Sequence, residues 1–146
     1  MDPLSLTASV IAVATLAYQS SKAAYDVVDG LIEAPNAIAD SKRLLSQTQN
    51  TLDTLTDTLT AGTETPGVLD SVLQKIKLDI ALESTQCLCD EFRKTITRYT
   101  NHSTELRFSS RDRFTVNLHE SKITKFNKQL GECQQTISLV LVSINM

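Results

Sequence analysis

The sequence predicts an all-α fold, an antiparallel bundle of four main helices that leaves room for one short extra helix. Only four glycines and three prolines punctuate the 146 residues, and tryptophan is absent. Barrels and sandwiches need a turn roughly every 8–12 residues, and doubly wound α/β folds need glycine-rich turns. Apolar residues also recur at helical spacing along most of the chain. The length, residues 1–146, corresponds to a single domain.

The first helix is predicted over residues 3–30. Asp2 and Pro3 suit the N-cap and the first helical position, and no charged side chain lies between Pro3 and Ser21. Its large apolar side chains include Leu4, Leu6, Val10, Ile11, Val13 and Leu16. The opening fifteen residues are apolar or small, which is short of the roughly 20 needed to cross a bilayer. Two interpretations stay open: a helix buried in the bundle core, or one that docks in one state and inserts into a membrane or an oligomer in another.

Two further helices are predicted over residues 35–61 and 66–100. Pro35 can open the second helix, whose apolar seam carries small polar residues as well; its positions are Ile38, Ser41, Leu45, Thr48, Leu52, Leu55 and Leu59. In the third helix one face is predicted to hold Leu69, Val72, Leu73, Ile76, Ile80, Leu88, Phe92, Ile96 and Tyr99. A break near 83–85 is the alternative to one unbroken helix.

The last part of the chain predicts a polar connection over residues 101–110 and a final helix. Ser109, Ser110 and Asp112 resemble a capping arrangement, followed by a short helical or irregular stretch to Leu118. Residues at helical spacing in the final helix are Ile123, Phe126, Leu130, Cys133, Ile137, Val140, Leu141 and Ile144. Gly131 costs about 1 kcal/mol relative to alanine inside a helix, so we expect close approach of a neighbouring helix there.

The reactive side chains do not predict an enzyme. Cys87 and Cys89 point apart on a helix, and two histidines without signature spacing do not suggest a zinc site. There is no Gly-x-Ser-x-Gly, no glycine-rich phosphate loop and no Glu-x-x-His. We therefore expect no catalytic residue, no cofactor, no metal and no small-molecule substrate. Cys89 and Cys133 are predicted to be buried and reduced, with a disulfide between their helices as the alternative. At most Cys87 is expected to be accessible to rapid labelling in the native protein.

Charge is unevenly distributed between the two halves. Residues 1–73 hold three basic and nine acidic side chains, a net charge of −6, whereas residues 74–146 hold eleven and eight, a net charge of +3. This excess is too weak to predict nucleic-acid binding. The basic side chains gather between positions 93 and 113: Arg93, Lys94, Arg98, Arg107, Arg111 and Arg113. They are interpreted either as a solvated helix end or as a contact patch for anionic lipid or an acidic partner.

Seven short motifs, spread in order over the chain, resemble a known family. They are residues 1–5, 10–13, 34–35, 89–92, 100–103, 111–113 and 130–133, which read MDPLS, VIAV, AP, CDEF, TNHS, RDR and LGEC. The family is the fungal N-terminal domain of STAND proteins, a HeLo-like family also found in azaphilone pigment cluster protein L-type proteins. The sequence departs from it at Asn117–Glu120, where the family has a glycine-bearing aromatic stretch that allows a local turn.

The resemblance implies a HeLo-like module at the N-terminus of a longer NLR-like receptor. It implies an effector or signalling domain that self-associates and is recruited to membranes in regulated cell death. On that interpretation Leu4, Leu6, Val10, Ile11 and Val13 insert, and the basic residues contact anionic head groups. The alternative is a helical homo-oligomerisation or protein-interaction module without membrane activity, linked to a pigment biosynthesis cluster. A third hypothesis, an enzyme or ligand carrier, would require a pocket between helices. Separately, the odd and sparse set of three cysteines and the acidic start without a secretory signal predict a cytoplasmic protein.

Overall fold

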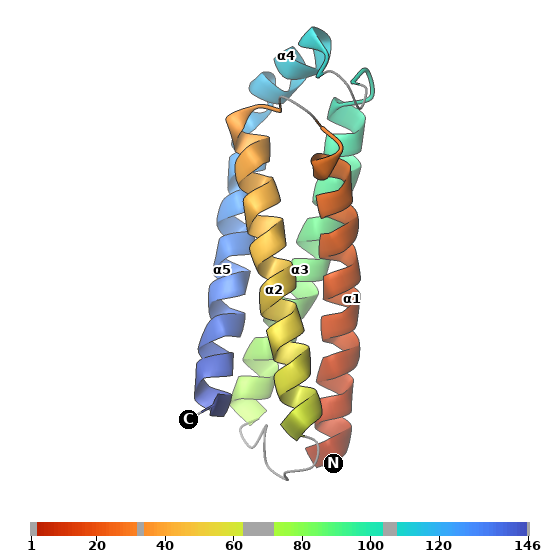
Figure 1. Cartoon of the computed structure of the whole chain (residues 1–146). Coiled ribbons are helices and arrows are strands. Elements are labelled where there is room, and N and C mark those ends of the chain that lie inside the picture. Colours follow the sequence, from red (N-terminus) through yellow and green to blue (C-terminus); the bar gives the residue numbers. More distant parts are fainter. Residues whose placement is uncertain (1–2, 32–33, 63–71, 104–107, 146) are drawn as a thin grey trace.

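The fold is all-helical in the part of the chain that the computed structural model describes. That part is residues 3–31, 34–62, 72–103 and 108–145, with side chains described except at 3–6, 62, 72–74 and 145. The helices are α1 (Pro3–Asp29), α2 (Asn36–Gly62), α3 (Val72–Tyr99), α4 (Ser110–Leu118) and α5 (Glu120–Asn145). The predicted all-α class is therefore confirmed (Figure 1).

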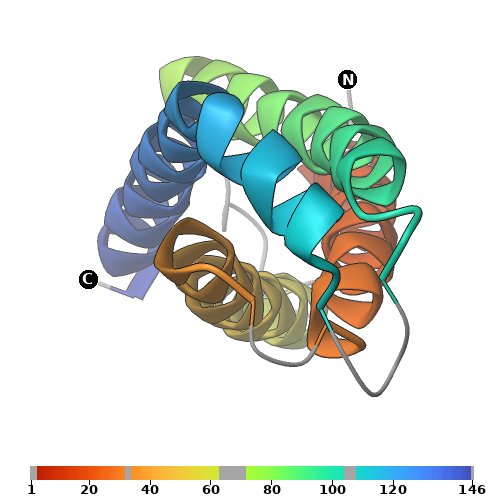
Figure 2. The same cartoon turned by 90° about the horizontal axis from the view of Figure 1, so that it is seen from above.

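The four long helices stand at the corners of a square, and the short α4 lies across one end (Figure 2). We call this the upper end, as in Figure 1. Helix α1 contacts α2 and α3, and α5 contacts the same two helices, so α2 and α3 lie on a diagonal. Because α1 and α3 both run upward while α2 and α5 both run downward, two of the four neighbouring pairs are parallel. The antiparallel bundle expected from the sequence therefore describes long helices that follow one another in the chain, but not the α1–α3 and α2–α5 neighbours.

The helix ends follow the sequence signals where the structure describes them. The carbonyl of Pro35 accepts hydrogen bonds from the amides of Ile38 and Ala39 as α2 begins. Ser109 is the N-cap of α4, and its hydroxyl accepts from the amides of Arg111 and Asp112. Helix α3 is continuous through residues 83–85, so the alternative break does not occur. Residues 2 and 66–71, predicted to begin α1 and α3, lie outside the described residues.

Two hydrophobic clusters fill the bundle, one above the other. The upper cluster contains aromatic and aliphatic residues: Ala24, Val28, Ala37, Ile38, Leu45, Cys89, Phe92, Ile96, Tyr99, Phe108, Val116, Ile123, Phe126 and Leu130. The lower cluster contains aliphatic residues only: Val10, Ala14, Ala17, Leu52, Leu55, Leu59, Leu78, Ala81, Leu82, Ile137, Val140 and Leu141. The seam predicted for α2 and most of that predicted for α5 are thereby confirmed.

A layer of buried hydroxyl groups separates the two clusters. Ser21, Thr48 and Thr85 each lie between an upper-cluster and a lower-cluster residue on their own helix, and all three are buried. Each hydroxyl donates to a backbone carbonyl one turn earlier, at Tyr18, Leu44 and Ala81 respectively. Each of these hydroxyl groups therefore donates its proton within its own helix, which satisfies the buried donor.

Three side chains predicted to be buried are exposed. Leu16 and Ile76 are 48% exposed, and Ile80 is 60% exposed. Helix α3 turns a different stripe inward, in which spacings of three and four residues alternate: Leu78, Leu82, Thr85, Cys89, Phe92, Ile96 and Tyr99. The prediction and the structure agree at Phe92, Ile96 and Tyr99, but toward the start of α3 the buried stripe continues through Thr85, Leu82 and Leu78, which leaves the two isoleucines outside.

The prediction of close helix packing at Gly131 is also wrong. A Cβ atom built at this position meets nothing within 4 Å. Small residues instead permit close packing on α1, where Ala14, Ala17 and Ala24 are fully buried. Helix α1 accordingly packs more extensively against α2 and α3 than α5 does.

Candidate interaction surfaces

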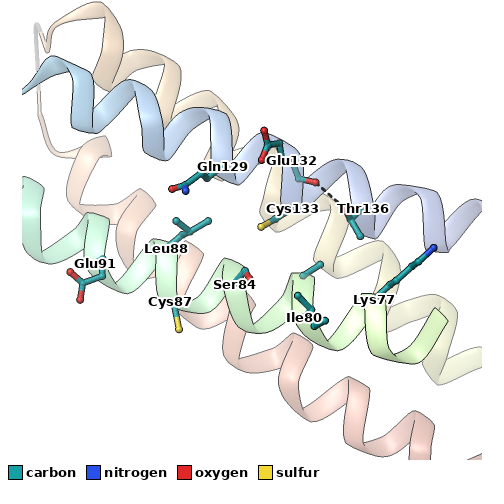
Figure 3. Close-up of a pocket in the computed structure, with 11 residues that line it drawn as sticks. Lys77, Ile80, Ser84, Cys87, Leu88, Glu91, Gln129, Glu132, Cys133 and Thr136 are labelled. Carbon is teal, nitrogen blue, oxygen red and sulfur yellow. Dashed lines mark hydrogen bonds between the residues drawn. The ribbon is translucent and has the colours of Figure 1, made fainter. Parts of the chain in front are cut away.

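A groove of about 620 Å³ runs between α3 and α5. From α3 it is lined by Lys77, Ile80, Ala81, Ser84, Cys87, Leu88 and Glu91, and from α5 by Gln129, Glu132, Cys133 and Thr136. Figure 3 shows Leu88 pointing toward α5 and Cys87 pointing away from it. The groove exists because Ala81, Ser84 and Cys133 are too small to fill the space between the two helices.

The groove combines an apolar surface with separated charges. Its volume suits a ligand or the side chains of a partner helix. Lys77 and Glu91 lie on α3 fourteen positions apart, which is about 21 Å along a helix. A second cavity of about 210 Å³ shares Leu88, Glu91 and Gln129 with the groove and extends the groove toward the upper end of the bundle. The two cavities therefore form one continuous groove between α3 and α5.

Large apolar side chains are exposed on the lower halves of α3 and α5. Ile76 and Ile80 on α3 and Leu139 and Val142 on α5 are all exposed. Ile80 lines the groove itself, and exposed large apolar side chains beside a groove are typical of an interaction surface. Sequence reasoning does not find this surface, because it places both isoleucines in the core. The signal that could have found it is the competing stripe from Leu78 to Tyr99.

The three cysteines differ in accessibility, and all are free thiols. Cys87 is exposed, as predicted, and Cys89 is buried, as predicted. Burial, with a smaller contribution from the charge of Asp90, raises the pKa of the Cys89 thiol to about 12. Cys133 is only half-buried, which corrects its prediction. Burial raises the pKa of the Cys133 thiol as well, while a hydrogen bond with Thr85 opposes that shift.

The apolar residues of α1 that are predicted to insert into a membrane pack against the bundle core wherever the structure describes their side chains. Val10 is fully buried in the lower cluster, and Ile11 and Val13 are half-buried against it. The side chains of Leu4 and Leu6 lie outside the described residues. Within the described part of the chain, none of the helices is both long and apolar enough to span a bilayer.

The predicted basic residues lie at the upper end of the bundle. Lys94, Arg98 and Arg111 are exposed, and no ion pair among the described residues involves them. Arg98 lies in the last turn of α3, where a positive charge complements the helix dipole. Arg93 is half-buried, and Arg113 is half-buried with its guanidinium 5.4 Å from the ring centroid of Phe108. Arg107 lies outside the described residues.

Asn117–Glu120, where the sequence departs from its resemblance, forms the junction between α4 and α5. His119 closes α4, and its amide donates to the carbonyls of Thr115 and Val116. Its ring stacks on Tyr99 with a centroid distance of 4.8 Å. The junction needs no glycine, because the φ angle of His119 is −110°.

The described residues contain no group of three or more histidine, cysteine or acidic side chains arranged to hold a metal ion.

The whole chain was compared with known protein families, curated proteins and solved structures. A family model described as the N-terminal region of the pigment biosynthesis cluster protein PigL matches residues 1–146. No match was found among curated proteins or among solved structures. The chain therefore belongs to the family of PigL N-terminal domains, which confirms the resemblance to the pigment-cluster domains.

Proposed function

We propose that this chain is a non-enzymatic helical interaction module that acts by self-association. The observation that carries the proposal is the groove between α3 and α5, which exposed Ile80 lines. The same two helices also expose Ile76, Leu139 and Val142. Covering such side chains on association contributes roughly 25 cal/mol per Å² of apolar area. The wider role is that of an N-terminal effector or signalling domain of a fungal STAND receptor, as the resemblance implies.

Sedimentation over a range of protein concentrations tests this proposal. The average mass should rise with concentration, and Ile80→Glu should shift the equilibrium toward monomer because it places a charge in the groove. Leu118→Glu is the matched control, because Leu118 is also exposed but lies on α4. A monomer at every concentration would exclude self-association of this chain.

Membrane engagement is the second candidate, and it is favoured by the exposed Lys94, Arg98 and Arg111. Basic groups near an anionic surface contribute roughly 1 kcal/mol each. Release of α1 would be opposed by the exposure of Val10 and its neighbours, at about 1.5–3 kcal/mol for each large apolar side chain. Self-association would raise the local concentration of basic groups at the membrane and so favour recruitment from the cytoplasm.

Co-sedimentation with vesicles that contain phosphatidylserine tests this second candidate. The triple variant Lys94→Glu, Arg98→Glu, Arg111→Glu should lose binding while keeping its helical circular dichroism. The control reverses the same number of charges at Lys122, Lys125 and Lys128, which are exposed on α5. Equal loss in both variants would indicate nonspecific charge attraction, and no binding by the wild type would rule out the membrane role.

A further inference from the structure

The side of α3 that lines the groove carries a pattern that is complementary to itself when read in the opposite direction. Ser84 is its midpoint, with Ile80 and Leu88 four positions away and Lys77 and Glu91 seven positions away. All five residues line the groove between α3 and α5. An antiparallel copy centred on Ser84 would therefore place Ile80 opposite Leu88 and Lys77 opposite Glu91.

We propose that this α3 surface binds the same surface of a second copy about a two-fold axis at Ser84. The inference rests on the proposed self-association and names its surface and its symmetry. A two-fold interface is formed by one patch on both subunits, so each contact between different residues occurs twice. The dimer would contain two Lys77–Glu91 pairs, each about 10.5 Å along the helix from the axis.

The residues in this pattern are accessible for such contacts. Lys77 and Glu91 are exposed, and neither forms an ion pair within the described part of the chain. Ile80 is exposed and Leu88 half-buried, so each has apolar surface left to cover. Ser84 is small and half-buried, which lets two helices approach closely at the axis.

Charge also decides the relative direction of the two copies. If the two α3 helices ran parallel in register, Lys77 would face Lys77 and Glu91 would face Glu91. Like charges placed opposite each other at an interface are unfavourable. The antiparallel arrangement converts both repulsive contacts into attractive ones, and therefore a second copy in this orientation is the occupant that the charges of α3 favour.

A charge swap tests the pairing in the full 146-residue chain. Lys77→Glu and Glu91→Lys should each weaken dimerisation by roughly tenfold or more, because each creates two like-charge contacts. The double variant Lys77→Glu, Glu91→Lys should restore it toward the wild-type value. Sedimentation equilibrium measures the dissociation constant, and circular dichroism verifies the fold. Lys128→Glu and Glu83→Lys, exposed positions that do not line the groove, are the matched controls.

Disulfide trapping tests the position of the axis. In a background with Cys87→Ser and Cys133→Ser, Ser84→Cys should give a covalent dimer on mild oxidation, because a residue on a two-fold axis lies opposite itself. Glu83→Cys in the same background should give much less. Self-association without charge-swap rescue and without trapping at position 84 would overturn this interface but keep the proposed function. A monomer at every concentration would overturn both and leave the groove to a partner of different sequence.

Discussion

The upper and lower clusters both fill the space between the four long helices, but they do so with different kinds of side chain. In the upper cluster the rings of Phe92 and Phe126 stack with centroids 4.0 Å apart. The lower cluster has no aromatic member and is made of alanine, valine, leucine and isoleucine. Aromatic rings bury more area per residue and prefer defined geometries. The upper half is therefore more specifically packed, whereas the lower half depends on closely spaced aliphatic helices.

Polar contacts between elements strengthen the same contrast. In the upper half, Asn127 on α5 donates to the carbonyl of Ala37, and its own side-chain oxygen accepts from Ser41 on α2. Asp112, which is buried, accepts from the amide of His102 and the hydroxyl of Ser103. Large aliphatic side chains near the lower cluster face outward instead. The comparison teaches that polar contacts between elements hold the upper end together, whereas the lower halves of α3 and α5 combine an aliphatic core with exposed aliphatic side chains.

The largest effect should come from breaking the aromatic stack. Phe126→Ala is expected to lower the free energy of unfolding by about 3–5 kcal/mol, because it removes a buried ring and leaves a cavity. Urea denaturation measures the loss. Phe114→Ala is the control, since Phe114 is 70% exposed and its removal should change stability by no more than about 0.5 kcal/mol. Equal effects of the two substitutions would contradict the assignment of the upper core.

Loss of the Asp112 carboxylate should have the next largest effect. Asp112→Ala leaves the amide of His102 and the hydroxyl of Ser103 without their shared acceptor, at a cost of about 1–3 kcal/mol. Faster amide hydrogen exchange should be concentrated in α4 and residues 100–103. Asp112→Asn keeps an acceptor oxygen and should lose less stability. Exchange that accelerates equally throughout the bundle would show that the contact does not act locally.

Gly131 gives a smaller effect of opposite sign. Gly131→Ala should raise the free energy of unfolding by about 0.5–1 kcal/mol, because alanine favours the helix and its Cβ atom meets no neighbour within 4 Å. Thermal or urea denaturation measures the gain. A loss of stability would mean that a neighbouring helix comes closer to this position than the structure places it.

The thiols give the smallest effect, a difference in reactivity without a change in stability. Alkylation of the native protein should modify Cys87 first, then half-buried Cys133, and buried Cys89 last. Because burial raises the pKa of the Cys89 and Cys133 thiols, their reactive thiolate forms increase only as the solution becomes alkaline. Denatured protein, in which the three rates should converge, is the control. If Cys89 of the native protein reacted as fast as Cys87, this would contradict the burial of Cys89 in the upper cluster.

Most helix positions are predictable from local patterns. Ile38, Leu45, Leu52 and Leu59 recur at seven-residue spacing and are all buried, because that period keeps side chains on one face of a helix. Ser109 precedes α4 as an N-cap, since a serine hydroxyl can accept from the free amides of a first turn. These features involve residues close together in the sequence, so local chemistry determines them.

The sequence by itself thus determined the helical class, most of the helix bounds, the buried seams of α2 and α5 and the exposure of Cys87. Only the tertiary structure decided which helices are neighbours and how α3 is rotated. Ile76 and Ile80 lie outside because Leu78, Leu82 and Thr85 on α3 face the core instead. The groove beside Cys133 exists because small side chains of α3 and α5 meet there. Both outcomes depend on contacts between distant segments, which the periodicity of a single helix does not contain.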